Sequence, residues 1–440
     1  RVNNFTKISY DMGPTLLSWL RRKKPETYRA IIDADRLSVT LRNGHGNAMA
    51  QCYNHLIMPL AKKRDKITQI VWGIRDFEFH YKRKPEGMWL PEAAVDRETL
   101  KLMAERGILF TVLCPSQASR VRKIGFGKRW EQVRGESINP KQAYRILLEW
   151  GKQFHVFFYD APLSRAIAFE GLLGNGDLFD YKLMNAFGRA RSPQLVTTAT
   201  DGESFGHHHK FGDMAIAYAL KKVEDQHLAT LTNYGDYLER FGSDHEADIF
   251  ENSSWSCYHG IERWRSDCGC RINLKPGWNQ KWRAILREAF EYLQKTIDEL
   301  FESKLDGLIR DPWSARNDYI EVMLDPGLES RQRYLERHAV RELNPEEKKM
   351  AWDLLEAEKF SLYMYTSCGW FFDDISGIEA VQVMKFALRA IELVGPYTPQ
   401  DVEVTVVQIL HHAKSNLPDK GTGADIFNRD VKKSRPTEKR

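Results

Sequence analysis

The chain has 440 residues, 42% of them hydrophobic, and a formal net charge of +5 from 65 basic and 60 acidic residues. This length can bury a large core, and it suggests two or three domains or one large barrel with additions. So mild a charge gives no support for a nucleic-acid partner, and no apolar run approaches the ~18 residues of a membrane helix. We therefore expect a cytoplasmic protein with neither a nucleic-acid nor a membrane partner.

The first 220 residues alternate short apolar runs with amphipathic helical patterns. The patterns predict helices over 15–39 with a break inside, over 66–83, 97–107 and 212–225, and a loop leading into a helix over 45–61. Strands are predicted within 86–94, 108–115, 156–161 and 195–202. Repeated strand–loop–helix units favour a parallel sheet or an α/β barrel.

From about residue 240 the pattern changes to long helices. They are predicted over 279–303, 344–367 and 377–394, after a loop-rich junction. We therefore divide the chain into a barrel-type catalytic domain (1–241), a junction that lines the site (242–278) and a helical domain (279–440). The basic run at the end, from residue 428, is expected to be a disordered, solvated tail.

Polar side chains stand where the predicted strands end. Glu92, Asp160 and Asp201 each follow one strand, and His45 and Asn47 lie in a glycine-rich loop. In a parallel sheet or barrel the carboxyl ends of the strands meet at one face, where active sites lie. The recurrence predicts a site built from separate loops on that face.

Two of these acids suit paired carboxylate chemistry. Pro91 restricts the turn before Glu92, so its carboxylate could act as a nucleophile or base, or only as an acid at a helix N-terminus. Asp201 and Glu203 flank Gly202, and two close acids raise each other's pKa, as a general acid requires. Asp201 could equally cap a helix. Two carboxylates on one face are the minimum set for cleaving a glycosidic bond.

The histidines and tryptophans allow two interpretations each. His207, His208 and His209 are adjacent, and neighbours in a run rarely converge on one ion, so hydrogen bonding to substrate or tuning of the acids is favoured over a metal site. The 12 tryptophans could stack on sugar rings or simply pack in the core.

Three of the six cysteines are clustered. Cys257, Cys268 and Cys270 follow the pattern C-x10-C-x-C, with His259 between the first two. A zinc ribbon would need paired C-x-x-C motifs, so reduced packing cysteines are favoured over a metal site. We therefore expect no metal and no cofactor.

Four segments of the sequence resemble glycoside hydrolase family 57, in particular its branch of long prokaryotic proteins. The segment 43–61 resembles the family's second conserved region, 72–96 the third, 199–220 the fourth and, more loosely, 253–264 the fifth. The third region ends on the nucleophile, which corresponds to Glu92, and the aspartate of the fourth is the general acid/base, which corresponds to Asp201. The resemblance implies a (β/α)7 barrel followed by helices, a retaining mechanism, α-glucan substrates and no required metal.

The chain departs from the family pattern at three places. The His-Gln-Pro motif of the first region is absent, so we expect an incomplete barrel that lacks its first strand. Met49 stands near the place of a usual glutamate, and Ser254 stands where an acid is common. These differences bear on the preferred linkage and chain length.

We therefore predict a retaining α-glycosidase or α-glucan transferase acting on starch- or glycogen-like α-glucans. Glu92 would attack C1, and Asp201 would first donate and then accept a proton. The side chains expected to stack on sugar rings are those of Trp89, Trp255 and Trp264. Those expected to hydrogen-bond sugar hydroxyls, or to adjust the pKa values of the two acids, are His45, Asn47, Glu203, His207 and His259. Two alternatives are a glycan-binding or inactive remnant, and a metal-dependent carbohydrate deacetylase with zinc held by Asp201 and two of His207–His209.

Overall fold

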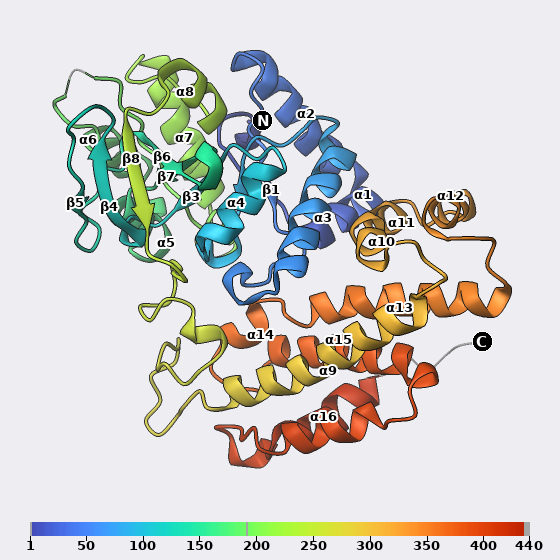
Figure 1. The fold of residues 1–440 in the computed structure, drawn as a ribbon. Coiled ribbons are helices and arrows are strands. Elements are labelled where there is room, and N and C mark those ends of the chain that lie inside the picture. The colour runs from blue at the N-terminus through green and yellow to red at the C-terminus, as the bar shows by residue number, and fades with distance from the viewer. Residues whose placement is uncertain (1, 191, 435–440) are drawn as a thin grey trace. The chain divides into compact units, whose positions relative to one another are not determined.

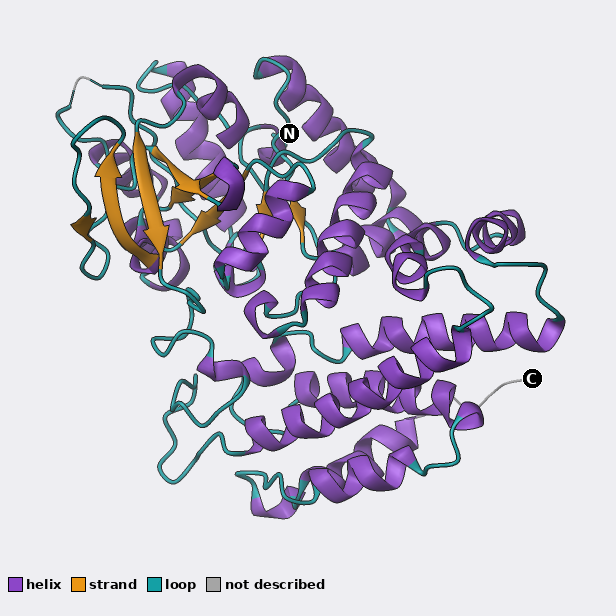
Figure 2. Cartoon of the chain, viewed as in Figure 1, coloured by secondary structure: helices purple, strands orange, loops and turns teal. Residues whose placement is uncertain are grey.

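The computed structural model describes residues 2–190 and 192–434, which form two compact units (Figures 1 and 2). The first comprises Arg1–Gln51 and Asp76–Trp255, and the second comprises Cys52–Arg75 and Ser256–Arg440. Residues 52–75 thus belong to the second unit, although in the sequence they lie between the two segments of the first unit. The order of sequence patterns, from which we predicted the domains, does not reveal this arrangement.

A row of parallel strands forms the centre of the first unit. Tyr10 bridges Ala48, and β1 (Ala50–Gln51) pairs with β2 (Met88–Trp89). Gly87, just before β2, bridges the start of β3 (Phe110–Leu113), which pairs with β7 (Gln153–Phe158). All of these pairings are parallel, so the carboxyl ends of the segments lie along one edge.

The predicted strand at 195–202 is extended but irregular. The Leu195 N–H donates to the Lys141 carbonyl, and the Thr197 carbonyl accepts from the Asp160 N–H. The segment therefore runs beside the end of β7 and delivers Asp201 near the same edge of the sheet.

Beyond β7 the sheet becomes mixed. Its strand order is β3-β7-β6-β8-β4-β5, with β6 (Ala143–Leu147), β8 (His245–Ile249), β4 (Ala118–Lys123) and β5 (Glu131–Gln132). The sequence analysis missed these four strands because charged residues interrupt their apolar pattern. The predicted α/β class is confirmed, whereas closure into an incomplete barrel stays a prediction.

The helices of the first unit follow local sequence signals. The break between α1 (Pro14–Lys23) and α2 (Pro25–Leu41) falls where Pro25 begins a new helix, and α4 (Arg97–Glu105) is followed by Gly107 at φ +85°. The other helices are α5 (Ala161–Phe169), α6 (Gly176–Asn185), α7 (Gly212–Asp225) and α8 (Tyr234–Phe241). The helix predicted within 45–61 is wrong, because β1 pairs there with the distant β2; α3 (Lys63–Tyr81) begins later and contributes residues to both units.

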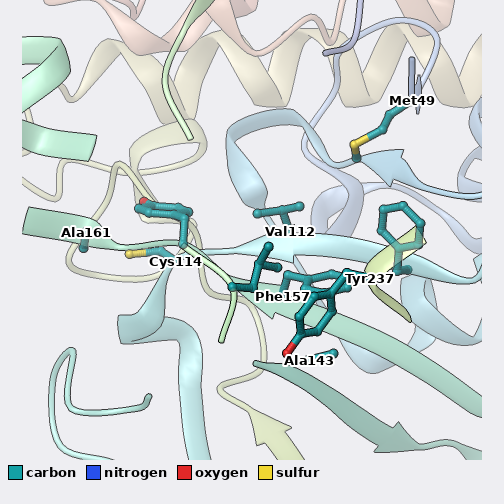
Figure 3. Packing of buried hydrophobic residues seen from close by; sticks show 10 residues of the cluster. Met49, Val112, Cys114, Ala143, Phe157, Ala161 and Tyr237 are labelled. Atoms are coloured by element: carbon teal, nitrogen blue, oxygen red, sulfur yellow. The ribbon is translucent and has the colours of Figure 1, made fainter. Parts of the chain in front are cut away.

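Alternate residues of the parallel strands face one hydrophobic core. Phe110, Val112 and Cys114 of the β3 segment meet Phe157 and Tyr159 of the β7 segment, with Met49 and Tyr237 in the same cluster (Figure 3). Thr111 and Leu113, which point to the opposite face of β3, are also buried, so this strand is covered by protein on both faces. Trp89 and Trp255 pack against the cluster and remain partly exposed, so the core lies directly beneath the strand ends that carry the acids.

The second unit is helical, as predicted. The three long predicted helices are α9 (Trp282–Leu305), α13 (Pro345–Tyr363) and α15 (Ile378–Val394), which pack side by side (Figure 1). The shorter helices are α10 (Pro312–Asp318), α11 (Ile320–Leu324), α12 (Leu328–His338), α14 (Cys368–Phe371), α16 (Val402–Leu410) and α17 (Gly423–Ile426). A buried guanidinium, that of Arg316, bridges Asp65 at 2.9 Å and Glu358 at 2.8 Å.

The prediction of a disordered tail from residue 428 is wrong for residues 428–434. Residues 427–431 form a π-helical turn that buries Phe427 and Val431, and a short turn continues to Ser434. Val431, the one hydrophobic residue in the run, and Phe427 just before it explain the difference. The remainder of the predicted tail, 435–440, lies outside the described residues. None of the helices in the described part of the chain has the length and apolarity needed to cross a bilayer.

Candidate active site

Four acidic side chains lie where the parallel strands of the first unit have their C-terminal ends. Asp11 follows the bridge residue Tyr10, Glu92 follows β2, and Asp201 and Glu203 follow the segment beside β7. The charges of Glu92 and Glu203 both raise the pKa of Asp201, and the charges of Asp201 and Glu203 both raise the pKa of Asp11. Asp201 therefore lies close enough to Glu92 and Glu203, and Asp11 close enough to Asp201 and Glu203, for their charges to repel.

Glu92 occupies a strained and tightly held turn. Its backbone is left-handed, with φ 57° and ψ 21°, a conformation that costs a residue with a Cβ about 1–2 kcal/mol. The Trp255 backbone N–H donates to the Glu92 carbonyl at 3.0 Å, and the Trp255 indole N–H donates to Glu92 Oε2 at 3.0 Å. The Gln117 side chain also donates to the Ala93 carbonyl at 2.7 Å. Main chain and carboxylate are thus fixed together, which suits a preorganised reacting group.

Aromatic rings stand beside this carboxylate. The ring centroids of Trp89 and Trp255 lie 5.1 Å apart at an angle of 67°, and those of Tyr159 and Trp255 lie 6.2 Å apart at 79°. The edge-to-face contacts fix the Trp255 indole, so its N–H stays aimed at Glu92.

Asp201 is an exposed residue in the turn that follows the segment beside β7. Its pKa is raised, first by surrounding protein that reduces its hydration and then by the charges of Glu92 and Glu203, while His208 opposes the rise. Its side chain makes no capping hydrogen bond to the short helical turn Gly202–Ser204 that follows. The alternative role of Asp201 as a helix cap therefore has no support in this structure.

The sequence analysis missed Asp11. Desolvation, followed by the charges of Asp201 and Glu203, raises the pKa of Asp11 from its ordinary 3.8 to about 7. A strand of one bridging residue gives no periodic signal, which is why Asp11 was not found. Met49 packs in the core.

Two predicted substrate-binding residues are engaged elsewhere. His45 Nδ1 lies 2.7 Å from Glu86 Oε1, and its Nε2 lies 2.6 Å from Glu239 Oε2. The Asn47 side chain is buried, donates to the Phe5 carbonyl at 3.0 Å and accepts from Asn233 at 3.1 Å. Both side chains stabilise their loop, so the prediction that they bind hydroxyls is not supported.

The other predicted residues are divided between the two units. In the first unit, His207 and His208 are exposed, His209 Nε2 lies 2.8 Å from the Ala168 carbonyl, and Asp160 caps α5 by accepting from the Leu163 N–H at 2.9 Å. His259 and Trp264 belong to the second unit. Trp264 is 0% exposed, so the prediction that it stacks on sugars is wrong, because its ring is enclosed by protein.

Metal-ligating side chains converge at a different place from the acids. Among the described residues, the only group of three or more such side chains is Cys257, His259, Cys268 and Cys270, which lies in the second unit. Asp201 and the three adjacent histidines do not form such a group within the described chain. The deacetylase alternative therefore lacks its ligand set within the described residues.

Replacing Asp11 with asparagine is expected to stabilise the protein at alkaline pH. Because the pKa of Asp11 rises from 3.8 to about 7 on folding, the folded state loses stability as pH increases through that interval. Asparagine cannot ionise, so thermal unfolding of Asp11→Asn should occur at a higher temperature than wild type at about pH 8 and at an equal one at about pH 3. The exposed Asp33→Asn serves as the matched control. Equal stabilisation at both pH values would contradict the assignment.

A pair of carboxyl groups at one site is the arrangement that most enzymes cleaving glycosidic bonds use. The chain belongs to glycosyl hydrolase family 57, whose sequence model matches residues 2–249. A second match, described as a domain of unknown function (DUF3536), covers residues 278–440.

Comparison with individual proteins gives distant relatives. The chain is 24% identical over 139 residues to α-amylase 1 of Dictyoglomus thermophilum, a match that spans 32% of this chain and only 19% of that protein. The solved exo-type maltose-forming amylase of Pyrococcus sp. ST04 aligns with a TM-score of 0.70 at 17% identity, over 93% of this chain and 72% of that one. The 4-α-glucanotransferase of Thermococcus litoralis aligns with a TM-score of 0.52 at 17% identity, over 90% of this chain and 55% of that one. At 17% identity, the structural similarity shows that this chain shares their fold, and it shows nothing beyond the fold.

Proposed function

We propose that this chain is a retaining enzyme that cleaves or transfers α-glucans. Glu92 attacks C1 of the bound sugar and forms a glycosyl-enzyme, while Asp201 protonates the leaving oxygen. Asp201 then takes the proton of the incoming water or sugar hydroxyl, which attacks C1 and releases Glu92.

The placement of Glu92 and Asp201 at one edge of the parallel strands, close enough for the charge of Glu92 to raise the pKa of Asp201, is the observation that carries this proposal. A general acid must hold its proton near the working pH, and here desolvation and the neighbouring Glu92 charge both act in that direction. The indole N–H of Trp255 supports the complementary role of Glu92, since an N–H donor stabilises a carboxylate and fixes its direction. The two acids thus have different surroundings, as their different roles require.

The substrate class rests on the family and on the fold. Similar solved structures include enzymes described as a maltose-forming amylase and a 4-α-glucanotransferase, which supports an α-glucan substrate for this chain. We assign sugar stacking to Trp89 and Trp255, which are partly exposed beside Glu92, and hydroxyl binding to Glu203 and His207. We also retain the incomplete (β/α)7 barrel as the interpretation of the parallel row.

The test is incubation of the full chain with maltoheptaose, with cellohexaose as the β-linked control. We expect cleavage of maltoheptaose alone, with the α-anomer as the first product in proton NMR spectra, because two displacements at C1 retain configuration. Products longer than the substrate would identify a transferase, and glucose units released to water would identify a hydrolase; both outcomes support the proposal. Binding of maltoheptaose without any product would instead support the glycan-binding remnant.

A further inference from the structure

The side chains of Cys257, His259, Cys268 and Cys270 converge on one point in the second unit. Their ligand atoms all lie within 4.8 Å of one another. Cys257 Sγ lies 4.0 Å from Cys268 Sγ and 3.8 Å from Cys270 Sγ, and Cys270 Sγ lies 3.5 Å from His259 Nδ1.

The three individual separations, 4.0, 3.8 and 3.5 Å, are close to those between the ligands of a tetrahedral metal site. Zinc binds thiolate sulfur at about 2.3 Å and imidazole nitrogen at about 2.0–2.1 Å, so two sulfurs around one ion lie ~3.8 Å apart, and a sulfur and a nitrogen ~3.6 Å. A disulfide would require a separation of about 2.05 Å between two sulfurs, roughly half of that found here. We propose that Cys257, His259, Cys268 and Cys270 bind one Zn²⁺ ion in a closed structural site.

The ligand types favour zinc over the other common ions. Three thiolates and one imidazole are soft ligands that exclude Ca²⁺ and Mg²⁺, which require oxygen. All four tetrahedral positions are filled by protein, so no position remains for a water or substrate, and the site is structural rather than catalytic. Each cysteine gives up its thiol proton to solvent as the ion binds.

The surrounding segment explains why the fold needs such a crosslink. None of the residues 265–279 is buried, and Ile272 and Leu274 are 57% and 78% exposed. The segment therefore lacks a hydrophobic core of its own, and a metal ion can replace one. Polar contacts complete the attachment: the buried Arg283 of α9 donates to the Cys270 carbonyl at 3.0 Å, and the Ile272 N–H donates to Asp373 at 2.8 Å.

Metal analysis of the purified full chain tests the site. We expect about one zinc ion per chain in the wild type, and at least about tenfold weaker zinc binding for Cys257→Ser, Cys270→Ser and His259→Asn. The exposed cysteine outside the cluster provides the control, since Cys368→Ser should keep its full zinc content. A strong chelator should lower the unfolding temperature of the wild type, and added ZnCl₂ should restore it.

Cobalt substitution of the wild type keeps the test decisive if the variants fail to fold. Co²⁺ held by three thiolates in a tetrahedron should give visible d–d bands together with a sulfur-to-cobalt charge-transfer band. Folded wild-type protein without zinc that binds neither Zn²⁺ nor Co²⁺ would overturn the proposal. So would a Cys257–Cys270 disulfide found by mass spectrometry, or bound iron with the absorption of an iron–sulfur cluster. None of these readouts depends on glucan turnover.

Discussion

Replacing Glu92 with glutamine should reduce turnover of maltoheptaose by about 10⁴-fold or more. Glutamine has the same shape and can still accept the Trp255 indole N–H, so the turn should survive, but an amide cannot form the glycosyl-enzyme. Steady-state product formation measures the loss, and thermal unfolding checks that the variant folds. The exposed Glu105→Gln, on α4 of the same unit, is the matched control and should retain full activity.

Replacing Glu92 with glycine gives a sharper readout of the same role. Glycine adopts the left-handed backbone of this position freely, so the variant keeps the turn while leaving space where the carboxylate stood. With an α-glucosyl fluoride as substrate, azide should enter that space, attack C1 directly and give the β-glucosyl azide by a single inversion. Full activity of either Glu92 variant, or an α-azide from the glycine variant, would contradict the nucleophile assignment.

Local sequence signals predicted the elements that form locally. The predicted helix 212–225 coincides with α7, because an amphipathic period and a polar loop mark a helix in any fold. The stretches that end in Glu92 and Asp201 were also recognisable, since each places an acid after an apolar strand. In such cases the information lies within about twenty neighbouring residues.

Features that depend on distant partners could not be read in this way. The segment with β1 was interpreted as a loop and helix because its partner β2 lies far along the chain. His45 was assigned to substrate because nothing local shows that Glu239 binds it. Asp11 was overlooked because its strand consists of one bridging residue. The spacing of the three clustered cysteines matches no common motif, so only the folded loop reveals that they meet His259.

Replacing Asp201 with asparagine should lower maltoheptaose turnover by about 10²–10⁴-fold, the usual contribution of a general acid. The loss should be much smaller with α-glucosyl fluoride, because fluoride leaves without a proton. In the wild type, kcat/KM should fall as pH rises through the raised pKa of Asp201, since the proton needed by the leaving oxygen is then lost. That alkaline decline should disappear in Asp201→Asn, while the exposed Asp213→Asn of α7 should keep it.

Azide separates the two acids by the stereochemistry of its product. In Asp201→Asn the glycosyl-enzyme on Glu92 still forms from the fluoride, and azide then displaces Glu92 from the opposite face, giving the α-glucosyl azide by two inversions. A β-azide from this variant together with an α-azide from Glu92→Gly would show that Asp201 is the nucleophile and Glu92 the general acid. Equal losses of fluoride and maltoheptaose turnover in Asp201→Asn would contradict proton donation, because a group that only positions the sugar affects both substrates alike.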